Sequence, residues 1–107
     1  MQKYKIRITS QAKLHLKEIR RYYEKELLLP DVAKTTVQSI KNTIRTLEEL
    51  PARAPVIEEQ PWGNEEIRKI AIKNYLIYFW IDETRLTVQI IAVIHEKMDQ
   101  AKQLKNI

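Results

Sequence analysis

One histidine near the end of the chain has the side chain best suited to acid–base chemistry. His95 closes a run of apolar residues, and a neutral imidazole can accept or release a proton near pH 7. The other histidine, His15, belongs to the first helical segment and is expected on its solvated side. Because a lone histidine at the end of a strand also serves for packing, the sequence leaves a catalytic role for His95 open.

Four cationic residues lie in or beside the last apolar segments, where they could bind an acidic partner. Lys69, Lys73 and Lys97 are expected to form a basic rim on the uncovered face of a sheet. Arg68 instead has the strand parity of the core-facing isoleucines. We therefore expect Arg68 to satisfy backbone carbonyls or a carboxylate at the start of its strand, with substrate contact as the alternative.

Two aromatic residues share the strand parity of Leu76. Tyr78 and Trp80 are therefore expected on the uncovered face of the sheet. There they stack on a nucleobase or pack beneath a helix of a partner protein. Either role makes this face a contact surface.

The composition excludes several kinds of site. The chain has no cysteine, so disulfides, thiolate zinc sites and a cysteine nucleophile are ruled out. It has no Gly-rich phosphate loop, metal-ligand cluster or serine–histidine elbow, and we expect no cofactor and no metal. We expect a cytoplasmic protein without membrane contact, because the first residues lack an apolar signal core and no apolar run reaches the length of a membrane span. The net charge of +5 suits an acidic partner, and it equally suits a well-solvated surface.

The elements that would position these residues begin with a strand and two helices. Residues 3–9 alternate in polarity with the period of a half-buried strand. Apolar residues then recur every three or four positions from Ala12 to Leu27, and again from Ala33 to Leu47. Proline is tolerated in the first turn of a helix but not inside one, so Pro30 separates two helices. The short break predicts an antiparallel helical hairpin.

A loop and three strands follow the hairpin. The prolines and the glycine of residues 51–64 predict a loop with a short extended piece at residues 56–57. In the last strand, alternation places Ala92 and Ile94 in the core and His95 on the uncovered face, near Lys69. A short helix is expected from Met98 to Leu104. The chain thus predicts one α+β domain over residues 1–107, with the hairpin on one face of a mainly antiparallel sheet.

Three stretches in the second half of the chain carry the pattern of a known family. They are an apolar strand with an arginine (67–70), a strand of the form Tyr-x-Ile-Tyr (75–78) and a final apolar strand that closes on histidine (90–95). Together with the opening strand and the order of the elements, they resemble the RelE/ParE toxins of bacterial type II toxin–antitoxin pairs. The resemblance covers essentially the whole chain. It implies a β-α-α-β-β-β fold, a protein that halts growth when free, and a cognate antitoxin that silences it.

The family has two branches with different targets. RelE-like toxins cleave messenger RNA in the ribosome with lysines and arginines on the open sheet face and a C-terminal tyrosine, whereas ParE-like toxins act on DNA gyrase. Lys69 stands at about the place of the first lysine of the nuclease pattern, but Ala71, Leu76 and Glu96 replace its other cations. No tyrosine follows Tyr78. Since each phosphate-stabilising contact is worth about 3 kcal/mol, the resemblance favours the ParE-like branch.

The sequence therefore predicts a toxin that binds a gyrase-type target and forms a hetero-oligomer with its antitoxin. The first alternative is a ribosome-dependent mRNA endoribonuclease that uses His95 and the basic rim. The second is an inactive homologue that only binds the antitoxin. The antitoxin is expected to be acidic and partly disordered where it lies over the open face. The position of the first strand in the sheet is left open.

Overall fold

The computed structural model describes residues 3–57 and 66–97, and its elements follow the predicted order. These are β1 (Lys5–Ile8), α1 (Ser10–Arg21), the π-helical turn η1 (Tyr22–Glu26), α2 (Pro30–Thr46), the 3₁₀ turn η2 (Pro51–Arg53), β2 (Arg68–Ile72), β3 (Tyr75–Asp82) and β4 (Thr87–His95). The predicted α+β fold is confirmed. The predicted C-terminal helix, Met98 to Leu104, lies outside the described residues.

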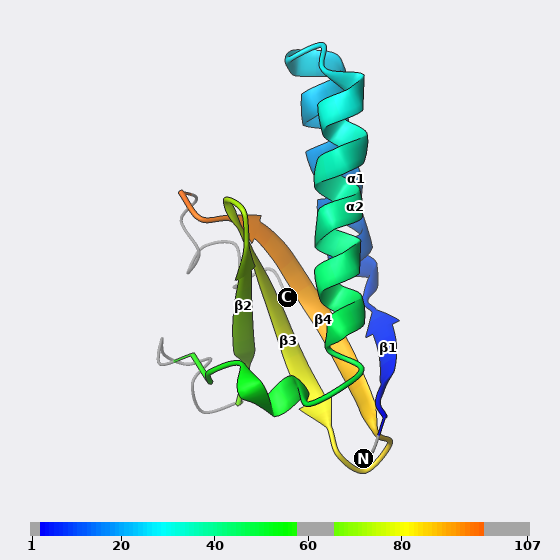
Figure 1. Cartoon of the computed structure of the whole chain (residues 1–107), viewed down its shortest axis with the longest axis vertical. Helices are drawn as coiled ribbons and strands as arrows, with labels where there is room; N and C mark the ends of the chain where they lie inside the picture. The colour runs from blue at the N-terminus through cyan, green and yellow to red at the C-terminus, as the bar shows by residue number, and fades with distance from the viewer. Residues whose placement is uncertain (1–2, 58–65, 98–107) are drawn as a thin grey trace.

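The four strands form one sheet in the order β1-β4-β3-β2. Neighbouring strands β2, β3 and β4 are antiparallel, whereas β1 pairs in parallel with β4, from Lys5 opposite Thr87 to Ile8 opposite Ile90. The first strand thus lies at one edge beside the last (Figure 1). β1 ends at Ile8, and among residues 3–57 and 66–97 no strand pairs with the second half of β4 on that side.

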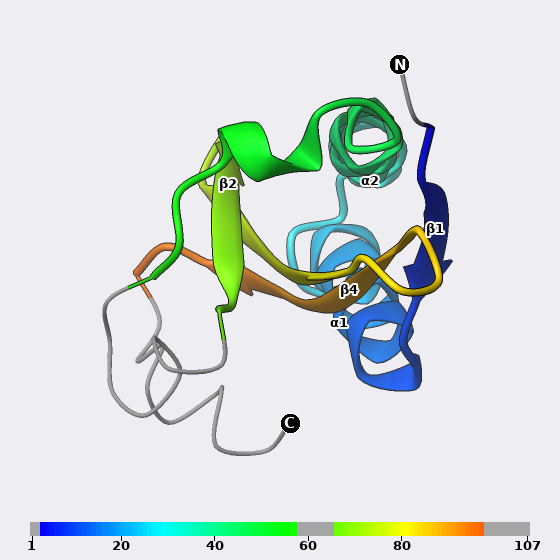
Figure 2. The ribbon, with the colours of Figure 1, turned by 90° about the horizontal axis from the view of Figure 1, so that it is seen from below.

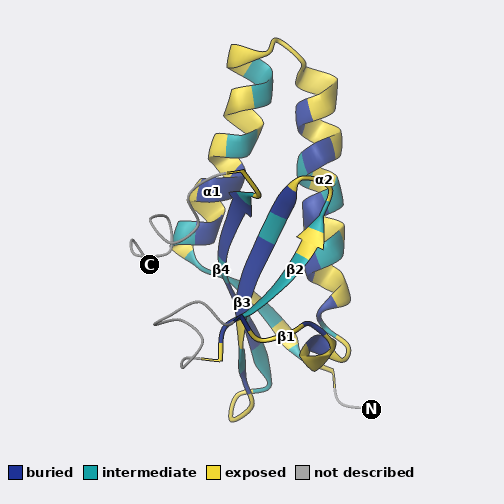
Figure 3. Ribbon diagram, turned by 90° about the vertical axis from the view of Figure 1, so that its left-hand side faces the viewer, coloured by how far each residue is buried: buried dark blue, intermediate teal, exposed yellow. Residues whose placement is uncertain are grey.

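The two helices form the predicted hairpin, packed on one face of the sheet and seen end-on in Figure 2. Thr9 caps α1 by accepting a hydrogen bond from the Ala12 amide, and Pro30 occupies the first turn of α2. The hairpin extends past the ends of the strands (Figures 1 and 3), which gives the molecule extents of 42 × 31 × 21 Å. No helix in the described part of the chain is long and apolar enough to cross a membrane.

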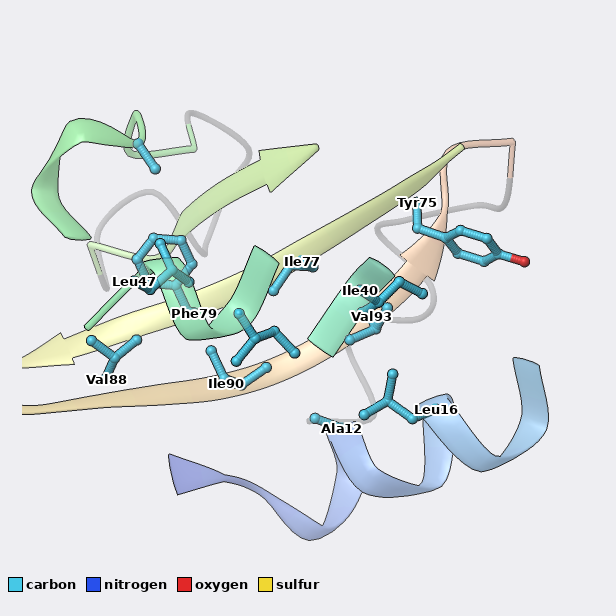
Figure 4. Packing of buried hydrophobic residues seen from close by; sticks show 12 residues of the cluster. Ala12, Leu16, Ile40, Leu47, Tyr75, Ile77, Phe79, Val88, Ile90 and Val93 are labelled. Atoms are coloured by element: carbon cyan, nitrogen blue, oxygen red, sulfur yellow. The ribbon is translucent and has the colours of Figure 1, made fainter. Parts of the chain in front are cut away.

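The main core lies between the hairpin and the sheet (Figure 4). Ile77, Phe79, Val88 and Ile90 contribute fully buried side chains from β3 and β4. Burying a side chain of this size stabilises the fold by roughly 1.5–3 kcal/mol. Tyr75 lies at one end of this cluster, beyond Val93, as Figure 4 shows.

A second, smaller core lies on the opposite face of the sheet, which was expected to be uncovered. Ile57 and Ile67 pack there against Tyr78, Ala92 and Ile94. The segment before β2 is fixed in place by backbone bonds, from the Ile57 amide to the Ile67 carbonyl (2.8 Å) and from the Lys69 amide to the Pro55 carbonyl (3.2 Å). The extended piece predicted at residues 56–57 is confirmed by the bridge between Val56 and Arg68.

A β-bulge in β4 changes which side chains face the hairpin. Tyr78 pairs with Ala92 while the next residue, Phe79, pairs with Ile90, so Ile91 is the extra residue of β4. Beyond the bulge Val93 packs in the hairpin-side core, whereas Ala92 and Ile94 belong to the opposite cluster. The predicted facing of β4 is therefore right as far as Ile90 and wrong from Ala92 onward.

Candidate functional site

Of the two aromatic residues expected to be exposed on the sheet face turned away from the hairpin, Trp80 is exposed and Tyr78 is buried. Trp80 is 39% exposed, as the strand alternation predicted. Tyr78 lies on the predicted face but is 0% exposed, because Ile57 and Ile67 cover it. The expectation that Tyr78 contacts a partner directly is therefore wrong.

A polar row crosses the sheet beside Trp80. Arg7, Gln89 and Trp80 are register neighbours on β1, β4 and β3. The Arg7 guanidinium donates a hydrogen bond from Nη1 to Gln89 Oε1 at 2.9 Å. The alternation of the first strand already put Arg7 on its polar side, but its place in a contact surface depends on the pairing of β1 with β4, which the sequence left open.

The three lysines of the predicted basic rim are spread along the edge and one end of the sheet. Lys69 is half-buried in β2, opposite Tyr78, whereas Lys73 and Lys97 are exposed. The Glu96 amide donates to the Asn74 carbonyl at 2.9 Å, so the turns that carry Lys73 and Lys97 meet at the same end of the sheet. Their role as contact residues remains a prediction.

Arg68 has the structural role expected from its parity. Its Nη1 donates to the carbonyl oxygens of Ala54 (2.6 Å) and Ala52 (3.2 Å). These bonds tie β2 to the segment that covers the second core, and the predicted bonding to backbone carbonyls is confirmed.

His95 faces the hairpin and not the opposite sheet face. Its ring lies edge-on to Tyr75, with 5.3 Å between centroids and 84° between planes, and its Nδ1 accepts a hydrogen bond from the Lys97 amide at 3.1 Å. The predicted position near Lys69 is wrong because the bulge at Ile91 reverses the facing of the strand end. No sequence signal marks this bulge, since residues 90–94 are apolar at both parities.

His15 is buried, at 8% exposed, and its predicted position on the solvated side of α1 is wrong. Its Nδ1 accepts a hydrogen bond from the Val93 amide at 3.1 Å, and its Nε2 lies 3.1 Å from the Gln11 side-chain nitrogen. Beyond Ile8 no strand of the described residues pairs with this edge of β4, and His15 supplies the acceptor that a neighbouring strand would give. Burial lowers the pKa of His15, and the nearby Glu18 carboxylate opposes this shift.

The two histidines line one cleft between the hairpin and the ends of β3 and β4. It has a volume of about 520 Å³ and is walled mainly by aromatic and apolar side chains. The Tyr75 hydroxyl donates to the Tyr23 hydroxyl at 3.3 Å across it. Burial, together with this bond, raises the pKa of Tyr75. No sequence signal marks this cleft, because its lining residues come from segments far apart in the chain.

Comparison with known proteins agrees with the family that the sequence resembles. No curated protein matches the chain. The family model of the ParE toxin of the type II toxin–antitoxin system parDE matches residues 6–100. The chain belongs to the ParE toxin family.

Solved structures share the fold of this ParE-family chain at low sequence identity. A chain of the chromosomal ParDE toxin–antitoxin system from P. aeruginosa superposes with a TM-score of 0.72 and 18% identity, covering 89% of this chain and 98% of the other. A chain of the RelBE2 toxin–antitoxin complex from Mycobacterium tuberculosis gives a TM-score of 0.61 and 19% identity, covering 87% and 98%. These likenesses establish the RelE/ParE fold.

Three described positions of this ParE-family chain lack the cations that the nuclease pattern places there. Ala71 and Glu96 are exposed, and Leu76 packs against the second core. These three residues occupy the positions at which the resemblance implies cations. In residues 3–57 and 66–97, no group of three or more histidine, aspartate or glutamate side chains is arranged to hold a metal ion.

Proposed function

We propose that this ParE-family toxin inhibits growth by binding a gyrase-type target protein, and that it does not cut RNA. The position of His95 carries the proposal. An RNase built on the open face needs an acid–base group beside cations that stabilise the phosphate. His95 lies on the hairpin side, edge-on to Tyr75, with the sheet between it and Lys69.

The chemistry of the open face also supports protein binding. Arg7, Gln89 and Trp80 present a charge, an amide and an aromatic ring side by side across three strands. Trp and Arg are enriched among the residues that dominate binding energy in protein interfaces. The exposed part of this face therefore suits a protein surface.

A cognate antitoxin is the second partner in the proposal. The structural neighbours come from toxin–antitoxin systems, which supports such a partner here. The turns that carry the exposed Lys73 and Lys97 meet at one end of the sheet, and their charges favour an acidic segment.

The test is controlled induction in a bacterial host without the antitoxin, with plasmid supercoiling and transcript ends measured in the same samples. We expect altered supercoiling and inhibition of purified gyrase, with intact transcripts. Codon-phased cleavage of ribosome-bound mRNA that is lost in both His95→Ala and His95→Gln, with normal supercoiling, would refute the proposal. The glutamine variant retains a polar side chain and guards against a folding defect. Unchanged growth, together with antitoxin binding by the purified protein, would instead identify an inactive homologue.

A further inference from the structure

The cleft between the hairpin and the strand ends has the size of a binding site and no role in the function proposed above. Its volume of about 520 Å³ falls within the range of roughly 300–1,000 Å³ typical of ligand pockets. The hairpin extends past the start of β3 and the end of β4 (Figure 1), and residues of the hairpin and of both strands line the cleft. It lies on the hairpin side of the sheet, away from Trp80 and Arg7.

The walls of the cleft carry aromatic rings in two perpendicular pairs. Tyr22 and Tyr23 lie 5.7 Å apart with 75° between their planes, and Tyr75 and His95 lie 5.3 Å apart with 84° between theirs. All four of these side chains are among those that line the cleft. The faces of aromatic rings attract cations, and cages of such rings bind ammonium and guanidinium groups.

The charge of the cleft also favours a cation. The chain has 19 lysines and arginines, yet none of them is among the described residues that line the cleft. The ionisable acid there is Glu18, which is exposed and forms no ion pair with any residue whose position the structure describes. A phosphate would be repelled by Glu18, so a nucleic acid does not suit this cleft.

A π-helical turn brings the two adjacent tyrosines to the cleft. The Leu27 amide donates to the Tyr22 carbonyl at 3.1 Å, a bond that spans five residues and widens the turn. Such turns inside helices occur frequently at functional sites. The chain then continues into an apolar rim at the hairpin tip, formed by Leu27, Leu28, Leu29 and Val32, all of them exposed.

We propose that the cleft receives an arginine side chain of a protein partner that lies across the hairpin tip. The guanidinium stacks on the tyrosine faces and pairs with Glu18, while apolar neighbours of the arginine cover the leucine rim. A free small cation would leave that rim in water, which is why a polypeptide is the better occupant. Arginine suits the cleft better than lysine because its planar group stacks on aromatic rings and is more weakly hydrated.

The test is an NMR titration of the purified full-length chain, following the ring C–H signals of Tyr22, Tyr75 and His95. The probes are Nα-acetyl-arginine methylamide, its uncharged analogue Nα-acetyl-citrulline methylamide, and an acetylated leucine-arginine-leucine peptide. We expect the arginine probe to shift these signals with an affinity in the millimolar range. The peptide should bind more tightly, and the citrulline probe should bind at least about threefold more weakly.

Variants separate a cation site from an apolar pocket. Glu18→Gln should weaken the arginine probe about threefold, whereas Glu49→Gln removes the same charge at the other end of the hairpin and should have no effect. Tyr22→Leu should also weaken it about threefold. Both Glu18 and Tyr22 are exposed, and the backbone amide spectrum verifies folding. Equal binding of arginine and citrulline, or insensitivity to Glu18→Gln, would overturn the cation site. A peptide that binds no better than the single residue would overturn the protein partner.

Discussion

The hydrogen bond between His15 and Val93 predicts that the stability of this toxin falls in mild acid. Nδ1 of His15 accepts the Val93 amide proton at 3.1 Å in a buried setting, so the ring must be neutral there. Burial lowers the pKa of His15 in the folded chain relative to the unfolded chain. The unfolded chain therefore binds a proton at a higher pH than the folded chain does.

The sign and size of the effect follow from that difference. The contribution of His15 is fully present above its unfolded pKa of about 6.5, and it is lost as the pH falls from there through the folded pKa. One extra proton on the unfolded state gives a slope of up to about 1.4 kcal/mol per pH unit. Once the ring is protonated it can no longer accept the Val93 amide, and a buried unpaired amide costs about 1–3 kcal/mol.

The assay is urea unfolding, followed by tryptophan fluorescence, from about pH 8 to about pH 5. His15→Asn is the decisive variant, because the amide oxygen of asparagine can accept the Val93 proton but does not titrate. We expect this variant to have a much flatter dependence of unfolding free energy on pH. His95→Asn replaces the other histidine of the same cleft and serves as the matched control. The reasoning is refuted if His15→Asn and the wild type lose stability equally in acid.

Four further variants probe the covering segment, the hairpin tip and the sheet face turned away from the hairpin. Arg68→Ala should lower the unfolding free energy by about 1–3 kcal/mol, because the Ala52 and Ala54 carbonyls lose their donor, as measured by urea unfolding. Leu28→Gly should raise it by up to about 1 kcal/mol, because Leu28 has a φ of 55° and is 75% exposed, as measured by thermal unfolding. Lys69→Glu with Lys73→Glu should weaken antitoxin binding and flatten its salt dependence in calorimetry. Leu76→Arg should speed hydrogen exchange of the Ile57 amide, because Leu76 packs against the second core.

Two of these variants have a matched comparison. Lys34→Glu with Lys41→Glu makes the same charge change on the exposed side of α2. If the substitutions on α2 weaken antitoxin binding while Lys69→Glu with Lys73→Glu does not, the antitoxin binds the hairpin. Leu86→Gly is the comparison for Leu28→Gly, because Leu86 has a φ of 47° but is half-buried and should gain less. Slow exchange at Ile57 in the Leu76→Arg chain would contradict the packing argument.

Much of the fold could be predicted because each element carries a local signal. The apolar stripes of α1 and α2 have the period of a helix, and Pro30 marks the start of the second helix. The bonding of Arg68 to backbone carbonyls followed from its parity with the core-facing isoleucines. In these cases the pattern that determines the structure lies within a few residues.

The incorrect predictions for His95, His15 and Tyr78 share a different physical cause. Strand alternation predicts the wrong sheet face for His95. Residues 90–94 are all apolar, so the sequence pattern does not reveal the one-residue bulge that reverses the facing. His15 was placed in solvent because its buried contact is with an amide of β4, far away in the sequence. Tyr78 was expected on an open face because nothing in the loop composition indicated that Ile57 would cover it. All three depend on long-range pairing, which local periodicity does not specify.

The departure from the nuclease pattern at Leu76 is linked to the covering of the sheet face, whereas the departures at Ala71 and Glu96 are not. Substitutions at exposed positions such as 71 and 96 usually change the free energy of unfolding by no more than about 0.5 kcal/mol. The side chains at these positions can therefore differ between toxins with different targets while the fold stays the same. Leu76 packs with Ile57, Ile67 and Tyr78, and an arginine there would bring a charge into that apolar cluster. A cationic sheet face at position 76 would therefore require the segment before β2 to detach from the sheet. On this scaffold, an apolar cover over Tyr78 and a phosphate-binding surface at the same place exclude one another.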